Sequence, residues 1–311
     1  MSRAEEHSPL VRDRLARRLR ASGCVFAEEE AALLLAEART SAQLEAMVER
    51  RAAGQPLEHV LGWAEFCDLQ IAVDPGVFVP RRRTELLARQ AVELARRAAH
   101  RRRRDHRDQP ADRPTDRPSG AAAPVVVDLC CGSGAVGAAV IAALGPVELY
   151  AVDLDAAAVR CARRNLTPAG GQVYQGDLVE PLPTALRGRV DVLVANAPYV
   201  PTEQVRFLSP EARVHEPRVA LDGGVDGLDV VRRLVAAAAR WLAPGGSLLV
   251  ETSERQAGLV VDALTSVNLV PLVIRCAELG ATVVVGIRKA DRADDPPSAG
   301  HQAGHRLVPA P

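Results

Sequence analysis

The sequence predicts an α/β fold in which helices cover both faces of a mostly parallel sheet. Three observations favour this class. Apolar runs of strand length alternate with helical patterns between residues 124 and 289, a glycine-rich turn follows the first run, and an acidic residue stands at the end of each of the first three runs. Repeated alternation of strand and helix is typical of parallel sheets, whose ligands bind beyond the carboxyl ends of the strands. We therefore expect a ligand site at that edge.

The beginning of the chain has a helical pattern, with apolar residues recurring at helical spacing. This periodicity predicts a small helical domain over residues 1–56. Residues 57–80 then contain two short apolar runs, 60–66 and 69–73, separated by a possible turn at residues 67–68. Strand-like runs separated by a short turn predict a β-hairpin, which would connect the helical domain to the sheet.

A linking helix is expected over residues 81–99, with Thr84 as its N-cap. Residues 100–123 are rich in Arg and Pro and have too little apolar surface to offset the entropy lost on ordering. We expect a disordered insert there, a disordered tail over 290–311, and the alternating domain over 124–289. The expected strands of that domain are 125–128, 148–153, 172–175, 190–195 and 247–251, with an antiparallel pair at 270–275 and 282–286. The expected helices are 135–144, 156–166, 229–242 and 256–266.

Composition excludes several classes of protein. With 311 residues, 48% of them apolar, and a formal net charge of zero, the chain can bury a large core and has no overall field that marks a nucleic-acid or membrane binder. The six cysteines lack the spacing of zinc or redox motifs, so no metal is expected. There is no apolar signal segment and no run of about 20 apolar residues. We expect a soluble cytoplasmic protein that acts as a monomer.

Acidic residues and glycines together predict a nucleoside site. Gly132 and Gly134 follow the first strand, where glycine lets the backbone turn tightly and approach a ligand. Asp128 lies at the tip of that strand and faces the same space. Asp153 ends the second strand, where a carboxylate can accept hydrogen bonds from both ribose hydroxyls. Asp177 ends the third, where it can accept a hydrogen bond from an exocyclic amine.

The same turn also satisfies the dinucleotide pattern Gly-x-Gly-x-x-Gly, so an NAD-dependent dehydrogenase must be weighed. The acid after the third strand and an NH2-binding motif after the fourth favour S-adenosylmethionine instead. Cys130 and Cys131 precede the turn. Adjacent cysteines suit neither a common zinc site nor a redox pair, so we interpret them as small loop residues, with Cys130 beside the cofactor.

The fourth strand is followed by Asn196, Ala197, Pro198 and Tyr199. The Asn196 amide oxygen and the Ala197 carbonyl can accept hydrogen bonds from an NH2 group, and Tyr199 can cover a planar amide or base. Pro198 restricts the backbone of Ala197, which helps to aim that carbonyl outward. An ordinary strand-to-loop exit would use similar residues. Together with the glycine turn, the motif predicts methyl transfer to a planar nitrogen.

These motifs resemble the HemK/PrmC family of S-adenosylmethionine-dependent glutamine N5-methyltransferases, which modify the glutamine of a Gly-Gly-Gln tripeptide in peptide-chain release factors. The resemblance covers roughly residues 10–288 and includes further segments at 51–62, 78–85, 216–224 and 226–228. It implies a Rossmann-like class I methyltransferase fold, S-adenosylmethionine as cofactor and a protein substrate. It also implies a substrate-side role for Arg81 and Glu85.

The chain departs from the family pattern at several positions. Ala197 replaces the first proline of Asn-Pro-Pro-Tyr, and Arg82 and Arg83 replace a proline and an acid before Thr84. Ser253 stands where the family has a glycine after a glutamate. The resemblance is therefore to a divergent branch, whose acceptor is a release factor or another translation protein.

Two other functions stay open. A nucleic-acid amino-methyltransferase would use the same motif on adenine N6, and binding of nucleic acid by the Arg-rich insert would favour it; otherwise nucleic acid is not expected as the direct substrate. A catalytically silent protein would bind the cofactor weakly, because Ala197 and Ser253 alter the motifs. In the favoured interpretation, the N-terminal helices recognise the protein substrate, and Asn196 with Ala197 orients its amide nitrogen. The alternative for these helices is that they only pack on the catalytic domain.

Overall fold

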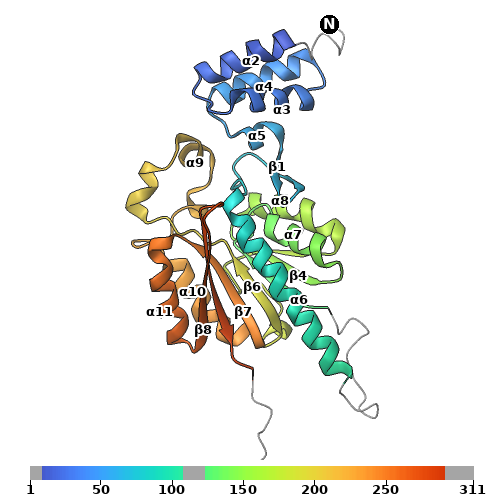
Figure 1. Cartoon of the computed structure of the whole chain (residues 1–311), viewed down its shortest axis with the longest axis vertical. Helices are drawn as coiled ribbons and strands as arrows, with labels where there is room; N and C mark the ends of the chain where they lie inside the picture. Colours follow the sequence, from blue (N-terminus) through green and yellow to red (C-terminus); the bar gives the residue numbers. More distant parts are fainter. Residues whose placement is uncertain (1–8, 108–122, 291–311) are drawn as a thin grey trace, which may run out of the picture.

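A computed structural model describes residues 9–107 and 123–290 (Figure 1). A helical bundle lies at one end of the molecule, and a sheet flanked by helices forms the larger part. Within the described residues, no helix is both long and apolar enough to cross a membrane. Most of the expected insert and nearly all of the expected tail lie outside the described residues.

Three helices form the N-terminal bundle, as predicted: α2 (Pro9–Ala21), α3 (Ala27–Glu37) and α4 (Ser41–Ala52). Their apolar stripes meet in a core that includes Leu19, Leu34 and Val48. Thr40 caps α4 by accepting a hydrogen bond from the N–H of Gln43 at 3.1 Å. Because helices this short are marginal alone, burial of these stripes stabilises the bundle.

The connector differs from the prediction at its start. Residues 60–62 were expected in a strand, but α5 (Leu57–Leu61) is a short helix that ends at Gly62, where φ is +85°. The hairpin that follows consists of β1 (Trp63–Phe66) and β2 (Leu69–Ala72), paired antiparallel. Cys67 and Asp68 form its turn with φ of 50° and 60°, the left-handed values that a tight hairpin turn requires. A proline before α5 and a glycine after it are helix start and stop signals. These signals account for the helix where the apolar run alone predicted a strand.

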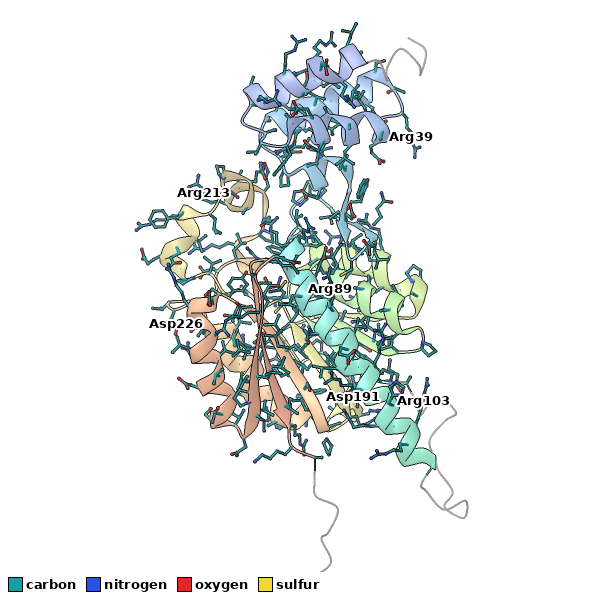
Figure 2. The ribbon with its side chains drawn as sticks, in the orientation of Figure 1. Arg39, Arg89, Arg103, Asp191, Arg213 and Asp226 are labelled. Carbon is teal, nitrogen blue, oxygen red and sulfur yellow. The ribbon has the colours of Figure 1, made fainter. Side chains whose placement is uncertain are left out.

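The linking helix is longer than predicted. After a 3₁₀ turn at Arg82–Thr84, α6 (Glu85–Arg107) continues through residues 100–107, which were wrongly assigned to a disordered insert. The reason is a contact with the sheet. Arg102 Nη2 lies 2.8 Å from a carboxylate oxygen of buried Asp191, which lies near this end of α6 (Figure 2). This ion pair joins residues 89 positions apart, so local composition could not reveal it.

The remaining strands form one seven-stranded sheet in the order β5-β4-β3-β6-β7-β9-β8. They are β3 (Val125–Leu129), β4 (Glu148–Asp153), β5 (Gln172–Gln175), β6 (Val190–Ala195), β7 (Leu242–Thr252), β8 (Leu269–Cys276) and β9 (Ala281–Arg288). Pairs from β5 to β7 are parallel, while β9 is antiparallel to both of its neighbours. The predicted mostly parallel sheet with an antiparallel end is confirmed. β7 begins earlier than predicted, because Leu242 pairs with Val190 beyond a register shift.

Helices cover both faces of the sheet (Figure 1). They are α7 (Ala135–Leu144), α8 (Ala156–Leu166), α10 (Asp229–Trp241) and α11 (Ala257–Ser266), and the short α9 (Pro210–His215) lies in the connection after β6. α6, α7 and α8 pack on one face through residues such as Leu87, Val140 and Leu166. α10 and α11 pack on the other through Leu234 and Leu264. The carboxyl ends of β3 to β6 remain available for a site between these layers.

Candidate active site

A cavity that is partly open to solvent lies at the carboxyl ends of the parallel strands. Polar side chains from four strand ends line it: Asp128, Asp153, Asp177 and Asn196. Each comes from a different strand, and the parallel arrangement brings the ends together at one edge. The structure therefore gathers these four predicted residues around one space.

The glycine turn contributes in two different ways. Gly132 has a φ of +56°, lines the cavity, and has no atom within 4 Å of the place where a Cβ would stand. Gly134 has a φ of +81°, and a Cβ there would lie 2.9 Å from Cδ1 of Leu166 on α8. Gly134 therefore permits close packing of α8, and it is not among the residues that line the cavity. Cys130 does line it, and burial raises the pKa of its thiol, which keeps the sulfur neutral.

Asp128 is a buried carboxyl group beneath the cavity. Its Oδ2 accepts a hydrogen bond from the N–H of Gly137, in the first turns of α7, at 3.0 Å. Burial raises the pKa of Asp128 to about 7, opposed by the Gly137 hydrogen bond and reinforced by the negative charge of Asp153. A cationic ligand in the cavity would favour the ionised form of Asp128.

Asp153 is held by backbone donors. Its Oδ2 accepts from the N–H of Gly132 at 2.8 Å, and its Oδ1 accepts from the N–H of Asp155 at 2.9 Å. Burial raises its pKa, while these two hydrogen bonds oppose the rise. Each carboxylate oxygen can accept more than one hydrogen bond, so Asp153 can still accept from a ligand. Asp177 instead faces Arg233 of α10, with Oδ2 2.6 Å from Nη2, and both residues line the cavity.

Some residues of the loop after β6 line the cavity, and others are buried in the core. Asn196 and Pro198 line the cavity, and Asn196 Nδ2 donates a hydrogen bond to Thr84 Oγ1 at 3.3 Å. Ala197 is buried in the apolar core. The hydroxyl of Tyr199 donates to Oε1 of Glu251 on β7 at 3.1 Å. Neither Ala197 nor Tyr199 is among the residues lining this cavity, although each is adjacent in the chain to Pro198, which lines it.

The segment before α6 connects the surrounding loops. Arg81 pairs with buried Glu216 at 2.6 Å, and Arg83 Nε donates to Glu251 Oε1 at 3.3 Å. Glu85 pairs with an arginine one turn further along α6 at 2.8 Å. Arg81 and Glu85, predicted on the substrate side, therefore make structural contacts, and neither is among the residues that line the cavity.

Three residues at this site were not assigned to it by sequence analysis: Thr84, Glu216 and Glu251. Glu216 begins a segment that carries the family resemblance, and this was an available signal. Glu251 lies two positions before Ser253, which is one of the departures from the family pattern. No local signal pairs Thr84 with Asn196, because 112 positions separate them.

The strand order, with three acids at successive strand ends and an antiparallel strand inserted beside β7, is that of a class I methyltransferase. The chain also matches the family model described as "Methyltransferase small domain" over residues 118–258. Fold and domain match together define the protein as a methyltransferase.

Similar proteins identify the family within this class. A release factor glutamine methyltransferase from Streptomyces coelicolor is 37% identical over 214 residues, covering 69% of this chain and 68% of that protein. One from Bradyrhizobium diazoefficiens is 35% identical over 241 residues, covering 78% of this chain and 74% of that protein. The chain belongs to the family of release factor glutamine methyltransferases, as its motifs predict.

A relative with a different named substrate also matches. The 4-amino-L-phenylalanine/4-methylamino-L-phenylalanine methyltransferase of Streptomyces pristinaespiralis is 37% identical over 209 residues, covering 67% of this chain and 65% of that protein. The compared relatives therefore include proteins named for methylation of a protein amide and of a small aromatic amine.

S-adenosylmethionine is the methyl donor of this class, and the cavity residues fit it. Four aspartates, Asp128, Asp153, Asp155 and Asp177, line the cavity with one arginine, Arg233, and this excess of acidic groups suits a donor that carries a sulfonium and an ammonium group. Gly132 leaves room for close approach of the donor to the backbone. Among the described residues, no group of three or more His, Cys, Asp or Glu side chains could hold a metal ion.

Proposed function

We propose that this protein transfers a methyl group from S-adenosylmethionine to the side-chain amide nitrogen of a glutamine in a peptide-chain release factor. The observation that carries the proposal is the position of Asn196. It lies at the carboxyl end of β6 and lines the same cavity as Asp128 and Asp153. The residue that would bind the substrate amide therefore lies in the same cavity as the residues that would bind the methyl donor.

The donor side of the cavity consists of charged and small groups. Asp153 would accept hydrogen bonds from ribose hydroxyls, because its two backbone donors leave further lone pairs on the carboxylate. Asp128 would hold the cationic part of the donor, and Gly132 and Cys130 would border it. Bound there, S-adenosylmethionine supplies an electrophilic methyl group. Arg233 binds Oδ2 of Asp177. An exocyclic amine of the donor would therefore bind Oδ1, or Arg233 would have to release Oδ2.

The acceptor side must orient a poor nucleophile. The lone pair of an amide nitrogen is delocalised into the carbonyl group, so the nitrogen has to be held with its lone pair toward the methyl group. Asn196 Oδ1 and the Ala197 carbonyl would accept hydrogen bonds from the two N–H groups, with Pro198 forming the adjacent wall. Orientation of this kind can lower a barrier by several kcal/mol.

The apolar part of the lining would exclude water. Phe78, Pro80, Pro198 and Val219 are apolar residues that line the cavity. Water would solvate and stabilise the charged ground state, so a dry cavity favours transfer of the methyl group.

A protein substrate would need more surface than one side chain offers. We propose that the N-terminal bundle, within residues 1–56, supplies it. Val25 and Phe26 between α2 and α3 are exposed by 80% and 66%, which leaves apolar groups available for a partner. Arg51 of α4 links the bundle to the segment above the cavity through a 2.6 Å ion pair with Glu211 of α9.

The test is transfer of labelled methyl from S-adenosylmethionine to purified release factors, with the modified residue located by mass spectrometry. The Asn196→Ala variant should lose the label, and the Asn268→Gly variant should keep it, because Asn268 is exposed beside β8 and has a φ of +61° that glycine tolerates. Label on 4-amino-L-phenylalanine or on nucleic acid but not on a release factor would contradict the proposal.

A further inference from the structure

Thr84 and Asn196 meet across the cavity wall. Thr84 ends the 3₁₀ turn before α6, is only 3% exposed, and lines the cavity together with Asn196. The Nδ2 group of Asn196 lies 3.3 Å from Thr84 Oγ1 and donates to it. This hydrogen bond ties the Asn196 amide to a residue that sequence analysis interprets only as a helix N-cap within the segment 78–85.

The direction of this hydrogen bond determines what Asn196 presents to the cavity. An asparagine side chain has a donor end and an acceptor end. With the NH2 end held by Thr84, the carbonyl end is available to an N–H group of the substrate. If the amide were rotated, its NH2 would face the NH2 of the substrate, and two donors would oppose each other.

Thr84 is itself held in place by its neighbours. Arg81 pairs with buried Glu216, and Arg83 donates to buried Glu251, so two arginines that precede Thr84 tie its segment to the connection after β6 and to strand β7. Its backbone N–H also donates to the carbonyl of Arg81 at 2.9 Å. These contacts hold the segment that carries Thr84, so its hydroxyl can anchor one end of the Asn196 amide.

We propose that Thr84 is a positioning residue, which acts through Asn196 to present an oriented acceptor oxygen to the substrate NH2 group. The effect on turnover rests on the proposed methyl transfer to an amide. The effect on the orientation of Asn196 does not rest on it.

The first test is the Thr84→Val variant, which keeps the shape of the side chain and removes the hydroxyl. We expect kcat to fall about tenfold with little change in the KM for S-adenosylmethionine, because orientation of the nucleophile, not binding of the donor, is lost. The Thr84→Ser variant should recover most of the activity. Thr265→Val is the matched control, since Thr265 is exposed on α11 and its hydroxyl donates to the carbonyl of Val261 in the same helix at 2.8 Å.

A second test measures the orientation directly. In ¹⁵N NMR spectra of the folded protein, the side-chain NH2 of Asn196 should show slow hydrogen exchange that is lost in Thr84→Val and retained in Thr84→Ser. Unchanged exchange in Thr84→Val would overturn the proposal, and so would unchanged kcat in an active enzyme. If the unmodified protein labels no release factor, the proposed function fails, and the NMR result still decides the role of Thr84.

Discussion

Arg81 and Glu216 join two loops whose neighbouring residues line the cavity, although the two residues are 135 positions apart. Arg81 Nη2 lies 2.6 Å from Oε1 and 2.7 Å from Oε2 of Glu216. Glu216 also accepts the N–H of Val79 at 3.2 Å, and the Arg81 guanidinium lies 4.9 Å from the ring centre of Phe78. Phe78 and Pro80 of one loop and Pro217 of the other line the cavity, so this ion pair holds two parts of the cavity wall together.

Substitution of Glu216 should therefore affect both stability and binding. In Glu216→Ala, the Arg81 guanidinium and the Val79 N–H lose a buried partner, and we expect the free energy of unfolding to fall by about 2 kcal/mol. Affinity for S-adenosylmethionine should fall as well, because the wall at Pro217 would move. Urea unfolding and calorimetric titration measure the two effects.

A matched control for this prediction is Glu203→Ala. Glu203 is exposed and lies 3.8 Å from Arg206, so its loss should change the free energy of unfolding by less than about 0.5 kcal/mol. Equal stability of the two variants would show that the Arg81–Glu216 pair does not hold the loops together.

Asp128 should make donor binding depend on pH. Burial raises its pKa to about 7, and a cationic donor prefers the ionised carboxylate. Affinity for S-adenosylmethionine should rise about tenfold from pH 6 to pH 8, because the ionised fraction rises by that factor around a pKa of 7. Calorimetric titration at several pH values measures this slope.

Asp128 should affect the stability of the donor-free protein with the opposite pH dependence to its effect on donor affinity. The folded protein without donor keeps the Asp128 proton more tightly than the unfolded chain, so the contribution of Asp128 to the free energy of unfolding falls as pH rises from about 4 to about 7. The Asp128→Asn variant should remove both slopes. A variant that keeps the full pH dependence of binding would assign it to another group.

The elements that were predicted with correct bounds have local signals. β4 and α8 are two such elements. β4 consists of an apolar run between two acids, Glu148 and Asp153. α8 begins after Asp155, whose side chain accepts the N–H of Ala157 at 2.9 Å. A strand of this kind and a capped amphipathic helix can be read from a short window of sequence.

The parts of the site that sequence analysis did not predict depend on distant contacts. Thr84 has the local signal of an N-cap, but its hydroxyl is used by Asn196 on another strand end. Tyr199 has the local signal of a substrate-covering ring, but its hydroxyl faces Glu251 across 52 positions. The residue types were informative, whereas their partners were determined by the order of strands in the sheet.

Gly134 should be intolerant of a side chain. Its φ of +81° disfavours other residues, and a Cβ would lie 2.9 Å from buried Leu166. We expect Gly134→Ala to lower the free energy of unfolding by about 2 kcal/mol. Gly258→Ala is the control, because Gly258 lies in α11 with open space around the added Cβ, and alanine there should stabilise by about 0.5–1 kcal/mol. Equal denaturant midpoints for the two variants would contradict the packing argument.

The ring and the hydroxyl of Tyr199 should contribute differently to stability and to kcat. The hydroxyl donates to Oε1 of Glu251 at 3.1 Å, and Glu251 is buried with its Oε2 lacking a hydrogen-bond partner among the described residues. Tyr199→Phe removes one of the two donors to this carboxylate, so we expect the free energy of unfolding to fall by about 1–2 kcal/mol. Burial and the nearby Glu251 charge raise the pKa of Tyr199, so the hydroxyl stays protonated at neutral pH.

Kinetics of the same variants separate the two contributions. Tyr199→Phe should keep most of kcat because the ring remains, whereas Tyr199→Ala should lose at least about tenfold because the loop that carries Asn196 loses its packing. Tyr174→Phe is the control: the Tyr174 hydroxyl bonds Gln172 at 2.9 Å on the edge strand β5, away from Glu251, and its loss should change neither kcat nor stability appreciably. A loss of kcat in Tyr199→Phe as large as in Tyr199→Ala would instead assign the hydroxyl a direct part in methyl transfer.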